Sequence, residues 1–89
     1  IPKTASIVII RMDRVPYVDQ SGLFALEDVL MELSQRNIEC LMVGLKSQPK
    51  YLMKSIRIIG KLISEEHLFE TFDECKKWVV SQQDMTPSN

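Results

Sequence analysis

This sequence has few of the residues from which a metal centre or a covalent framework is built. Its 89 residues include two cysteines and one histidine, and the cysteines, Cys40 and Cys75, lie 35 positions apart. A structural zinc site needs about four ligands in closely spaced pairs, so that class of site is excluded. Both cysteines have apolar surroundings, which predicts buried thiols in a reducing compartment, although a disulfide between them is left open.

Long apolar runs and an excess of charge of one sign are also absent. No apolar run is longer than about five residues, whereas a membrane-spanning helix needs roughly 20. Eleven basic and twelve acidic residues give a net charge of −1, so no overall field attracts nucleic acid or an anionic membrane. The first residues lack the basic and apolar regions of a signal peptide. These features predict a soluble chain with one small domain.

Glycine is scarce as well, with three in the chain. Gly22 and Gly44 lie outside the G-x-x-x-x-G-K and G-x-G-x-x-G patterns that cradle phosphates. His67 has only Glu65 and Glu66 near it in the sequence and no nucleophile at a motif spacing, so we expect it in a surface loop. The residues themselves therefore predict no metal site, no phosphate-cradling loop and no catalytic motif, and no cofactor is expected unless the chain binds a nucleotide.

What the sequence does contain is an alternation of strands and helices. The apolar runs at residues 7–12 and 38–44 predict two buried strands. Between them, apolar residues at helical spacing predict a helix over residues 20–36, with Asn37 as its left-handed end. A strand, a helix and a strand in this order predict a right-handed parallel βαβ unit.

Two more helices are predicted in the second half of the chain. Pro49 stands at the favoured first position of a helix that extends to near Gly60. Thr71 and Glu74 have the spacing of a capping box, which predicts that a last helix begins at Thr71.

The sheet that these elements imply is too thin to be complete. Both predicted strands have the continuous apolar character of central strands, and a central strand needs a neighbour on each side. We therefore expect the domain, which includes residues 1–83, to lack one or more strands that precede Ile1. Residues 84–89 are expected to form a disordered tail.

The most specific pattern lies between the first strand and the first helix. Asp19-Gln20-Ser21-Gly22 places a carboxylate, a hydroxyl and free backbone N–H groups at one helix N-terminus. Such a terminus can bind an anion or a phosphate, although Asp and Ser are also ordinary helix caps. Ligands and partners gather at the C-terminal ends of parallel strands, so we predict that this turn is the functional surface. The predicted contact residues are Tyr17, Asp19, Gln20, Ser21, Gly22 and Leu23.

Four basic residues of the second predicted helix form another candidate surface. They are Lys50, Lys54, Arg57 and Lys61, spaced four, three and four apart. On one continuous helix this spacing would form a single stripe. The stripe suits contact with an acidic partner or with anionic lipids, and it equally suits a solvated helix face.

The order of elements and the Asp-x-Ser-Gly turn resemble the STAS domain, which sulfate transporters and anti-sigma factor antagonists share. Residues 15–30 are similar to the strand-turn-helix pattern of the transporter branch, the SulP anion permeases, and residues 65–75 are similar to its C-terminal half. The resemblance implies an α/β, STAS-like fold, in which a mixed sheet of four or five strands is flanked by helices mostly on one face. The family's domain usually begins with a β-hairpin and a further helix, the part that the strand count finds missing.

The same resemblance implies a regulatory domain without chemistry of its own, on the cytoplasmic side of an integral membrane transporter. Its implied partners are the membrane transport domain of the same polypeptide and a soluble regulatory protein, and not nucleic acid. In the antagonists, a partner kinase phosphorylates the serine before the glycine, and Ser21 occupies that position. Two alternatives therefore stay open: a free-standing anti-sigma factor antagonist switched by phosphorylation of Ser21, and a small nucleotide-binding module.

Overall fold

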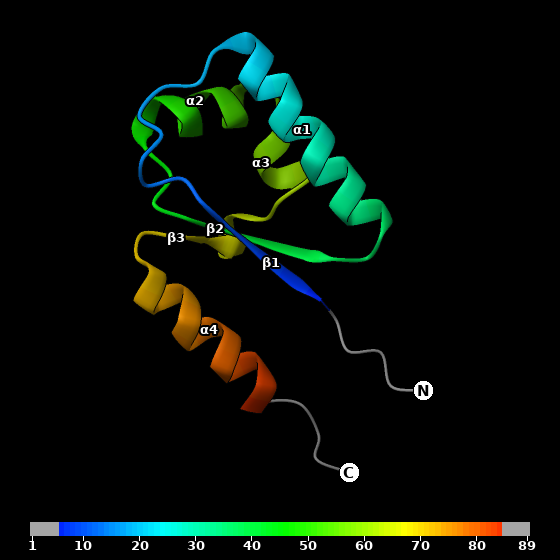
Figure 1. Ribbon diagram of the computed structural model, residues 1–89, viewed down its shortest axis with the longest axis vertical. Coiled ribbons are helices and arrows are strands. Elements are labelled where there is room, and N and C mark those ends of the chain that lie inside the picture. The colour runs from blue at the N-terminus through cyan, green and yellow to red at the C-terminus, as the bar shows by residue number, and fades with distance from the viewer. Residues whose placement is uncertain (1–5, 85–89) are drawn as a thin grey trace.

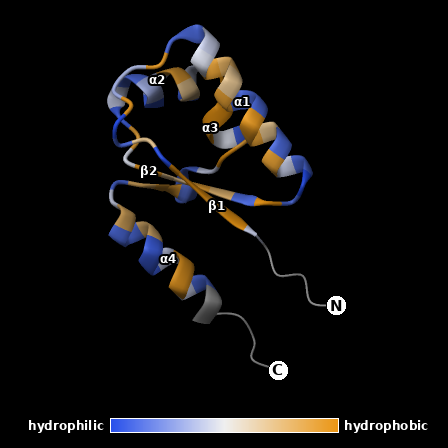
Figure 2. Cartoon of the chain, viewed as in Figure 1, coloured by the Kyte–Doolittle hydropathy of each residue, from blue (hydrophilic) through white to orange (hydrophobic). Residues whose placement is uncertain are grey.

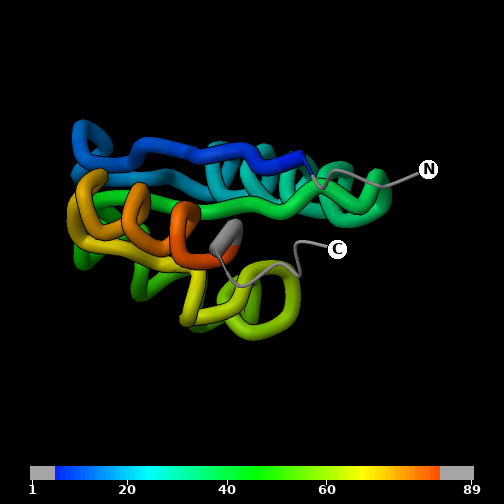
Figure 3. The backbone as a smooth tube through the Cα atoms, turned by 90° about the horizontal axis from the view of Figure 1, so that it is seen from below, coloured from blue at the N-terminus to red at the C-terminus, as the bar shows by residue number. Residues whose placement is uncertain are grey.

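The computed structural model describes residues 6–84, in which one small sheet lies between two helical layers (Figure 1). The strands are β1 (Ile7–Arg11), β2 (Glu39–Val43) and β3 (Leu68–Phe69), in the spatial order β1-β2-β3. The helices are α1 (Gln20–Gln35), α2 (Ser47–Ser55), α3 (Ile58–Lys61) and α4 (Phe72–Asp84), and a 3-10 turn, η1 (Glu65–His67), precedes β3. Helices α1, α2 and α3 cover one face of the sheet, and α4 covers the other (Figures 1 and 3).

The predicted parallel βαβ unit is confirmed. Strand β1 pairs parallel with β2, with Ile9 opposite Leu41, and β2 pairs parallel with β3. Strand β3 was not predicted, because two residues are too few to show an alternation of apolar and polar side chains. The described sheet is entirely parallel, so the mixed character that the resemblance implies is not seen in residues 6–84.

Strand β1 differs from the expectation of a central strand. It is the edge strand of the sheet as far as residues 6–84 show, and its residues are exposed or half-buried. Strand β2 is the central strand, and four of its five residues are buried. The strands expected before Ile1 fall outside the described residues.

Alternation along β2 divides the core into two parts, one on each face of the sheet. Cys40 and Met42 point toward α1, α2 and α3, and they join the larger cluster of buried side chains. Leu41 and Val43 point the other way and pack with Cys75 of α4. Figure 2 shows the strands as largely hydrophobic and the helices as mixed along their length, as this layered burial requires. No helix within residues 6–84 is long and apolar enough to cross a bilayer.

The prediction of one helix extending to near Gly60 is wrong. Helix α2 ends at Ser55, Arg57 takes a left-handed conformation with φ of 66°, and Gly60 has φ of 109°. The turn at Arg57 buries both Ile58 and Ile59, at 1% and 7% exposure. Full burial of an isoleucine stabilises by about 1.5–3 kcal/mol, which exceeds the roughly 1–2 kcal/mol cost of one left-handed residue.

The ends of the long helices agree closely with their sequence signals. Helix α1 begins at Gln20 as predicted, and Asn37 has the expected left-handed φ of 63°. Before α4, the Oγ1 atom of Thr71 accepts a hydrogen bond from the backbone N–H of Glu74 at 3.2 Å. In a capping box the Glu74 carboxylate would accept from the backbone N–H of Thr71. It accepts instead from the N–H of Glu70, the residue before the predicted cap. Of the predicted tail, Asp84 is the last residue of α4, and residues 85–89 lie outside the described part.

Candidate functional site

The Asp-x-Ser-Gly turn lies at the C-terminal edge of the sheet, as predicted. Beyond β1, the backbone N–H of Met12 donates to the carbonyl oxygen of Val43 at 2.8 Å, which extends the pairing with β2. The N–H of Val15 then donates to the carbonyl oxygen of Met12 at 3.0 Å, which turns the chain away from the sheet. The loop reaches the N-terminus of α1 at Asp19.

Asp19 is the N-cap of α1. Its backbone is extended, and its Oδ1 atom accepts a hydrogen bond from the N–H of Gly22 at 2.8 Å. A Cβ atom on residue 22 would lie 3.3 Å from that same oxygen, so glycine gives the cap its room. Ser21 is exposed, and its hydroxyl makes no hydrogen bond within the described part of the chain. Of the two possible caps in this motif, Asp19 therefore acts as the cap and Ser21 does not.

Replacing Asp19 with alanine is expected to lower the free energy of unfolding by about 1 kcal/mol, the usual loss for an N-cap. Replacing Ser21 with alanine is expected to change it by less than about 0.5 kcal/mol, because the hydroxyl has no partner to lose. Urea denaturation of the two variants measures both quantities. Equal losses would show that the hydroxyl shares the capping role.

A glutamine from α2 holds the turn in place. The N–H of Val18 donates to Oε1 of Gln48 at 2.8 Å, and Nε2 of Gln48 donates to the carbonyl oxygen of Val18 at 3.1 Å. The side-chain amide of Gln48 thus bonds both the N–H and the C=O of Val18, as the backbone of a paired antiparallel strand residue would. Sequence reasoning missed this contact because the two residues are 30 positions apart and no motif relates them.

A hollow of about 390 Å³ lies beside the turn, between the loop and the first turns of α1. It is lined by Met12, Val15, Tyr17, Val18, Asp19, Gly22 and Leu26. Six of these residues contribute apolar or aromatic side chains or a glycine, and Asp19 is the one charged residue among them. The hollow therefore combines an apolar wall with a single carboxylate.

The six predicted contact residues do not all lie on the surface. Tyr17 is 68% exposed, and Asp19, Gln20, Ser21 and Gly22 are also exposed. Leu23 is only 5% exposed and packs in the larger core cluster, so its prediction as a contact residue is wrong. The first inward position of an amphipathic helix follows its cap closely, and Leu23 occupies it.

The predicted basic stripe is not continuous, because the helix that would carry it is broken. Lys50 and Lys54 lie on α2, Arg57 lies in the left-handed turn, and Lys61 ends α3. All four are exposed. Lys54 also forms an ion pair with Glu65, with 3.2 Å between Nζ and Oε2. The four charges therefore do not lie on one helix face.

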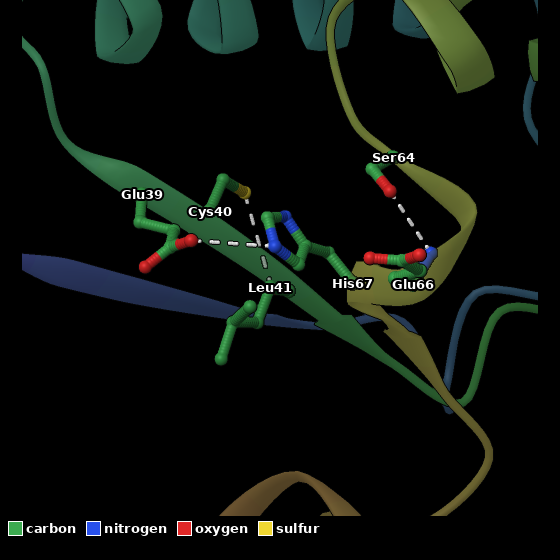
Figure 4. A network of polar contacts seen from close by, with 6 residues as sticks. All are labelled: Glu39, Cys40, Leu41, Ser64, Glu66 and His67. Atoms are coloured by element: carbon green, nitrogen blue, oxygen red, sulfur yellow. Dashed lines mark hydrogen bonds and ion pairs between the residues drawn. The ribbon is translucent and has the colours of Figure 1, made fainter. Parts of the chain in front are cut away.

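His67 was predicted as a surface loop residue, but it is half-buried and contacts side chains from other elements. Its side chain is 22% exposed, and its Nε2 atom lies 3.3 Å from Oε2 of Glu39 (Figure 4). Its ring also meets the ring of Trp78 edge-on, with 5.2 Å between the centroids. His67 thus connects β2, η1 and α4 at the end of the sheet opposite the turn, beside a groove of about 740 Å³ that Glu39 and Cys40 also line. Neither partner is close to His67 in the sequence, so no local pattern could reveal the cluster.

Both cysteines are buried free thiols, as predicted, and they lie on opposite faces of the sheet. Burial raises the pKa of the Cys40 thiol from about 9 to about 11 and also raises the pKa of Cys75. No three histidine, cysteine or acidic side chains come together as metal ligands within residues 6–84.

These thiols are expected to react slowly with an aromatic disulfide reagent at about pH 8 and to react fully once urea unfolds the chain, because the thiolate is the reactive form.

The raised pKa of the Cys40 thiol also predicts that stability depends on pH. The unfolded chain loses its thiol protons first, so stability is intact below about pH 9 and falls as the pH rises toward 11. Urea denaturation at a series of pH values measures this, and the variant Cys40→Ala should show a smaller decline.

Comparison with known proteins is consistent with this geometry. The sequence profile described as the STAS domain matches residues 2–75. A Bacillus subtilis protein named as a candidate sulfate transporter, YvdB, is 34% identical over 73 residues; the match covers 82% of this chain and 13% of that protein.

Two solved structures have similar folds. A sulfate transporter family protein from Wolinella succinogenes matches with a TM-score of 0.79 and 25% identity, over 96% of this chain and 69% of the other. The STAS domain of a SulP transporter from Vibrio cholerae matches with a TM-score of 0.82 and 24% identity, over 97% of this chain and 66% of the other. The chain therefore spans only part of the proteins that it matches.

Proposed function

This chain belongs to the STAS domain family, and we propose that it is the cytoplasmic regulatory domain of a SulP-type anion transporter. The similarity to YvdB supports this, because that protein is named as a sulfate transporter and is much longer than the matched segment. The fold, shared with a SulP transporter STAS domain, agrees with it. Fold alone does not decide function, so the proposal depends on the sequence relative and on the exposed turn.

The proposed mechanism is contact rather than catalysis. The turn at Asp19 and the outer side of α1 form an exposed surface at the edge of the sheet. Tyr17 and Val29 are large apolar side chains exposed there, and Phe24 is exposed on the opposite flank of α1. Exposed apolar side chains near one another are typical of a contact surface. A domain changes transport if this surface binds one state of the transport domain more tightly than another.

The transporter proposal is tested in the full-length polypeptide. We expect that polypeptide to contain several hydrophobic segments of roughly 20 residues outside residues 1–89. Uptake of labelled sulfate into membrane vesicles is then compared between the intact protein and a form without this domain, at equal amounts of inserted protein. A changed uptake rate or substrate dependence supports the proposal, and identical uptake contradicts it. A polypeptide without hydrophobic segments would also contradict it.

A free-standing anti-sigma factor antagonist is the second candidate, and the exposure of Ser21 favours it. The hydroxyl is accessible, has no hydrogen bond within residues 6–84, and lies in the first turn of α1, where the helix dipole stabilises a phosphate. Intact mass of the protein isolated from its own cells would detect one added phosphate, and the variant Ser21→Ala should lack it. A single unmodified mass under all growth conditions would count against the antagonist. Titration with a labelled nucleotide tests the third candidate, the nucleotide-binding module. Saturable binding supports it, and the absence of saturable binding contradicts it.

A further inference from the structure

We infer that the hollow beside the turn is a receptor for a lysine or arginine side chain, carried by a basic cytoplasmic loop of the membrane transport domain. This inference depends on the proposed function and names the partner of the same surface. Its first support is the size of the hollow. The hollow is open to solvent, and its volume of about 390 Å³ is far larger than the roughly 15 Å³ that one water molecule needs, so a side chain can enter it.

The second support is the chemistry of the lining. The walls are apolar, from Met12, Val15 and Leu26, and the one charged group is the carboxylate of Asp19. Lysine and arginine match this lining, because each has an aliphatic stem that suits the apolar walls and a cationic head that suits the carboxylate. The Oδ1 atom of Asp19 is used by Gly22, whereas Oδ2 makes no hydrogen bond to another described residue. Oδ2 is thus available to a cation while the helix cap stays intact.

The third support is the charge of the segment that carries the hollow. From Val15 to Gln35 the chain has four acidic residues and no lysine, arginine or histidine. These acidic residues are Asp19, Glu27, Asp28 and Glu32. Asp19 lines the hollow, whereas Glu32 pairs with Arg36 at 3.8 Å. The acidic residues outnumber the basic ones along this segment, so its charge favours a basic peptide over an acidic one. Complementary charge therefore favours a basic partner.

The fourth support is the origin of such a partner. The cytoplasmic loops of membrane proteins carry an excess of lysine and arginine. A domain on the cytoplasmic side meets these loops first, so an acidic, partly apolar hollow suits them. The surface continues from Gly22 and Leu26 to the exposed Val29, spaced four and three apart on one helix face. An apolar side chain of the loop, next to its basic residue, would contact Val29.

The first test separates charge from helix capping. Asparagine caps a helix about as well as aspartate, so Asp19→Asn removes the charge and keeps the cap. The matched control is Asp73→Asn, which removes one exposed acidic charge from α4 on the opposite face of the sheet. The probe is an amphipathic peptide of about 15 residues with lysine and leucine at helical spacing, and its counterpart has glutamate in place of lysine.

We expect the lysine peptide to bind the whole chain saturably and to shift the amide NMR signals of Tyr17 and Gly22. We expect Asp19→Asn to weaken this binding by about tenfold or more and Asp73→Asn to weaken it by less than about twofold, because hydrogen bonds to charged groups dominate such contacts. Absence of saturable binding, equal binding of the glutamate peptide, or equal effects of the two variants would each overturn the inference. A normal urea midpoint for Asp19→Asn shows that a loss of binding is not a loss of folding.

The second test uses the full-length transporter in its membrane. A photoreactive phenylalanine analogue replaces Tyr17, which is 68% exposed at the hollow. Cross-linking to a lysine- or arginine-rich loop of the same polypeptide supports the inference, and cross-linking to lipid or to another protein overturns it. The two proposals fail differently. If removal of the domain changes sulfate uptake but Asp19→Asn does not, the receptor is wrong and the regulatory function stands.

Discussion

Replacing Gly44 with alanine is expected to lower the free energy of unfolding by about 3 kcal/mol or more, a severe effect for one added methyl group. Gly44 follows β2 with φ of 75°, a conformation that costs a residue with a side chain about 1–2 kcal/mol. The new Cβ atom would also lie 2.6 Å from Cβ and 2.9 Å from Cα of Asp13. Because one of these atoms belongs to the backbone, a rotation of the Asp13 side chain cannot relieve the overlap. Urea denaturation of the purified variant measures the loss.

Gly60→Ala is the matched control for this prediction. Gly60 also has a positive φ, of 109°, but a Cβ atom built on it meets nothing within 4 Å. It should therefore show the backbone cost alone, about 1–2 kcal/mol. The difference between the two variants isolates the overlap with Asp13. Equal losses would show that the loop at Asp13 moves aside at little cost.

Replacing Leu41 with alanine is expected to lower the free energy of unfolding by about 2–5 kcal/mol, the usual range for a fully buried leucine. Leu41 is 0% exposed on the central strand, and it belongs to the small cluster with Val43 and Cys75 that attaches α4 to the sheet. A cluster of so few buried side chains has little capacity to close around a cavity. In this variant, amide hydrogen exchange should become faster in α4 than in α1, because α4 packs on the face that loses the leucine and α1 packs on the other.

Val80→Ala is the control for the loss at Leu41. Val80 lies on α4 and is 54% exposed, and alanine is the better helix former, so its effect should be within about 0.5 kcal/mol of zero. A similar loss in the two variants would contradict the prediction, because an exposed side chain of α4 would then contribute as much as the buried contact of Leu41.

The elements that follow from local signals were predicted well. Asp19 and Asn37 mark the ends of α1 because a helix cap and a left-handed end require particular residue types. The parallel pairing of β1 and β2 follows from the helix between them. The break at Arg57 was missed because it depends on which isoleucines the sheet can bury, and that is decided by tertiary packing rather than by periodicity.

The candidate site was predicted in place but not in detail. The exposed turn follows from an Asp-x-Ser-Gly pattern after a strand, and the structure places it at the expected edge. The contact between Gln48 and Val18 could not be predicted, because a glutamine side chain has no preferred distant partner in the sequence. The contact of His67 with Glu39 and Trp78 was missed for the same reason.

The two hydrogen bonds from Gln48 to Val18 have a consequence for how this turn can change during evolution. Both involve the backbone atoms of Val18 and neither involves its side chain. The position of the loop is therefore held independently of the side chains that it displays. Substitutions at Tyr17 or Ser21 can alter the surface that the loop displays without moving it, so related STAS domains can differ at this surface on one unchanged backbone frame.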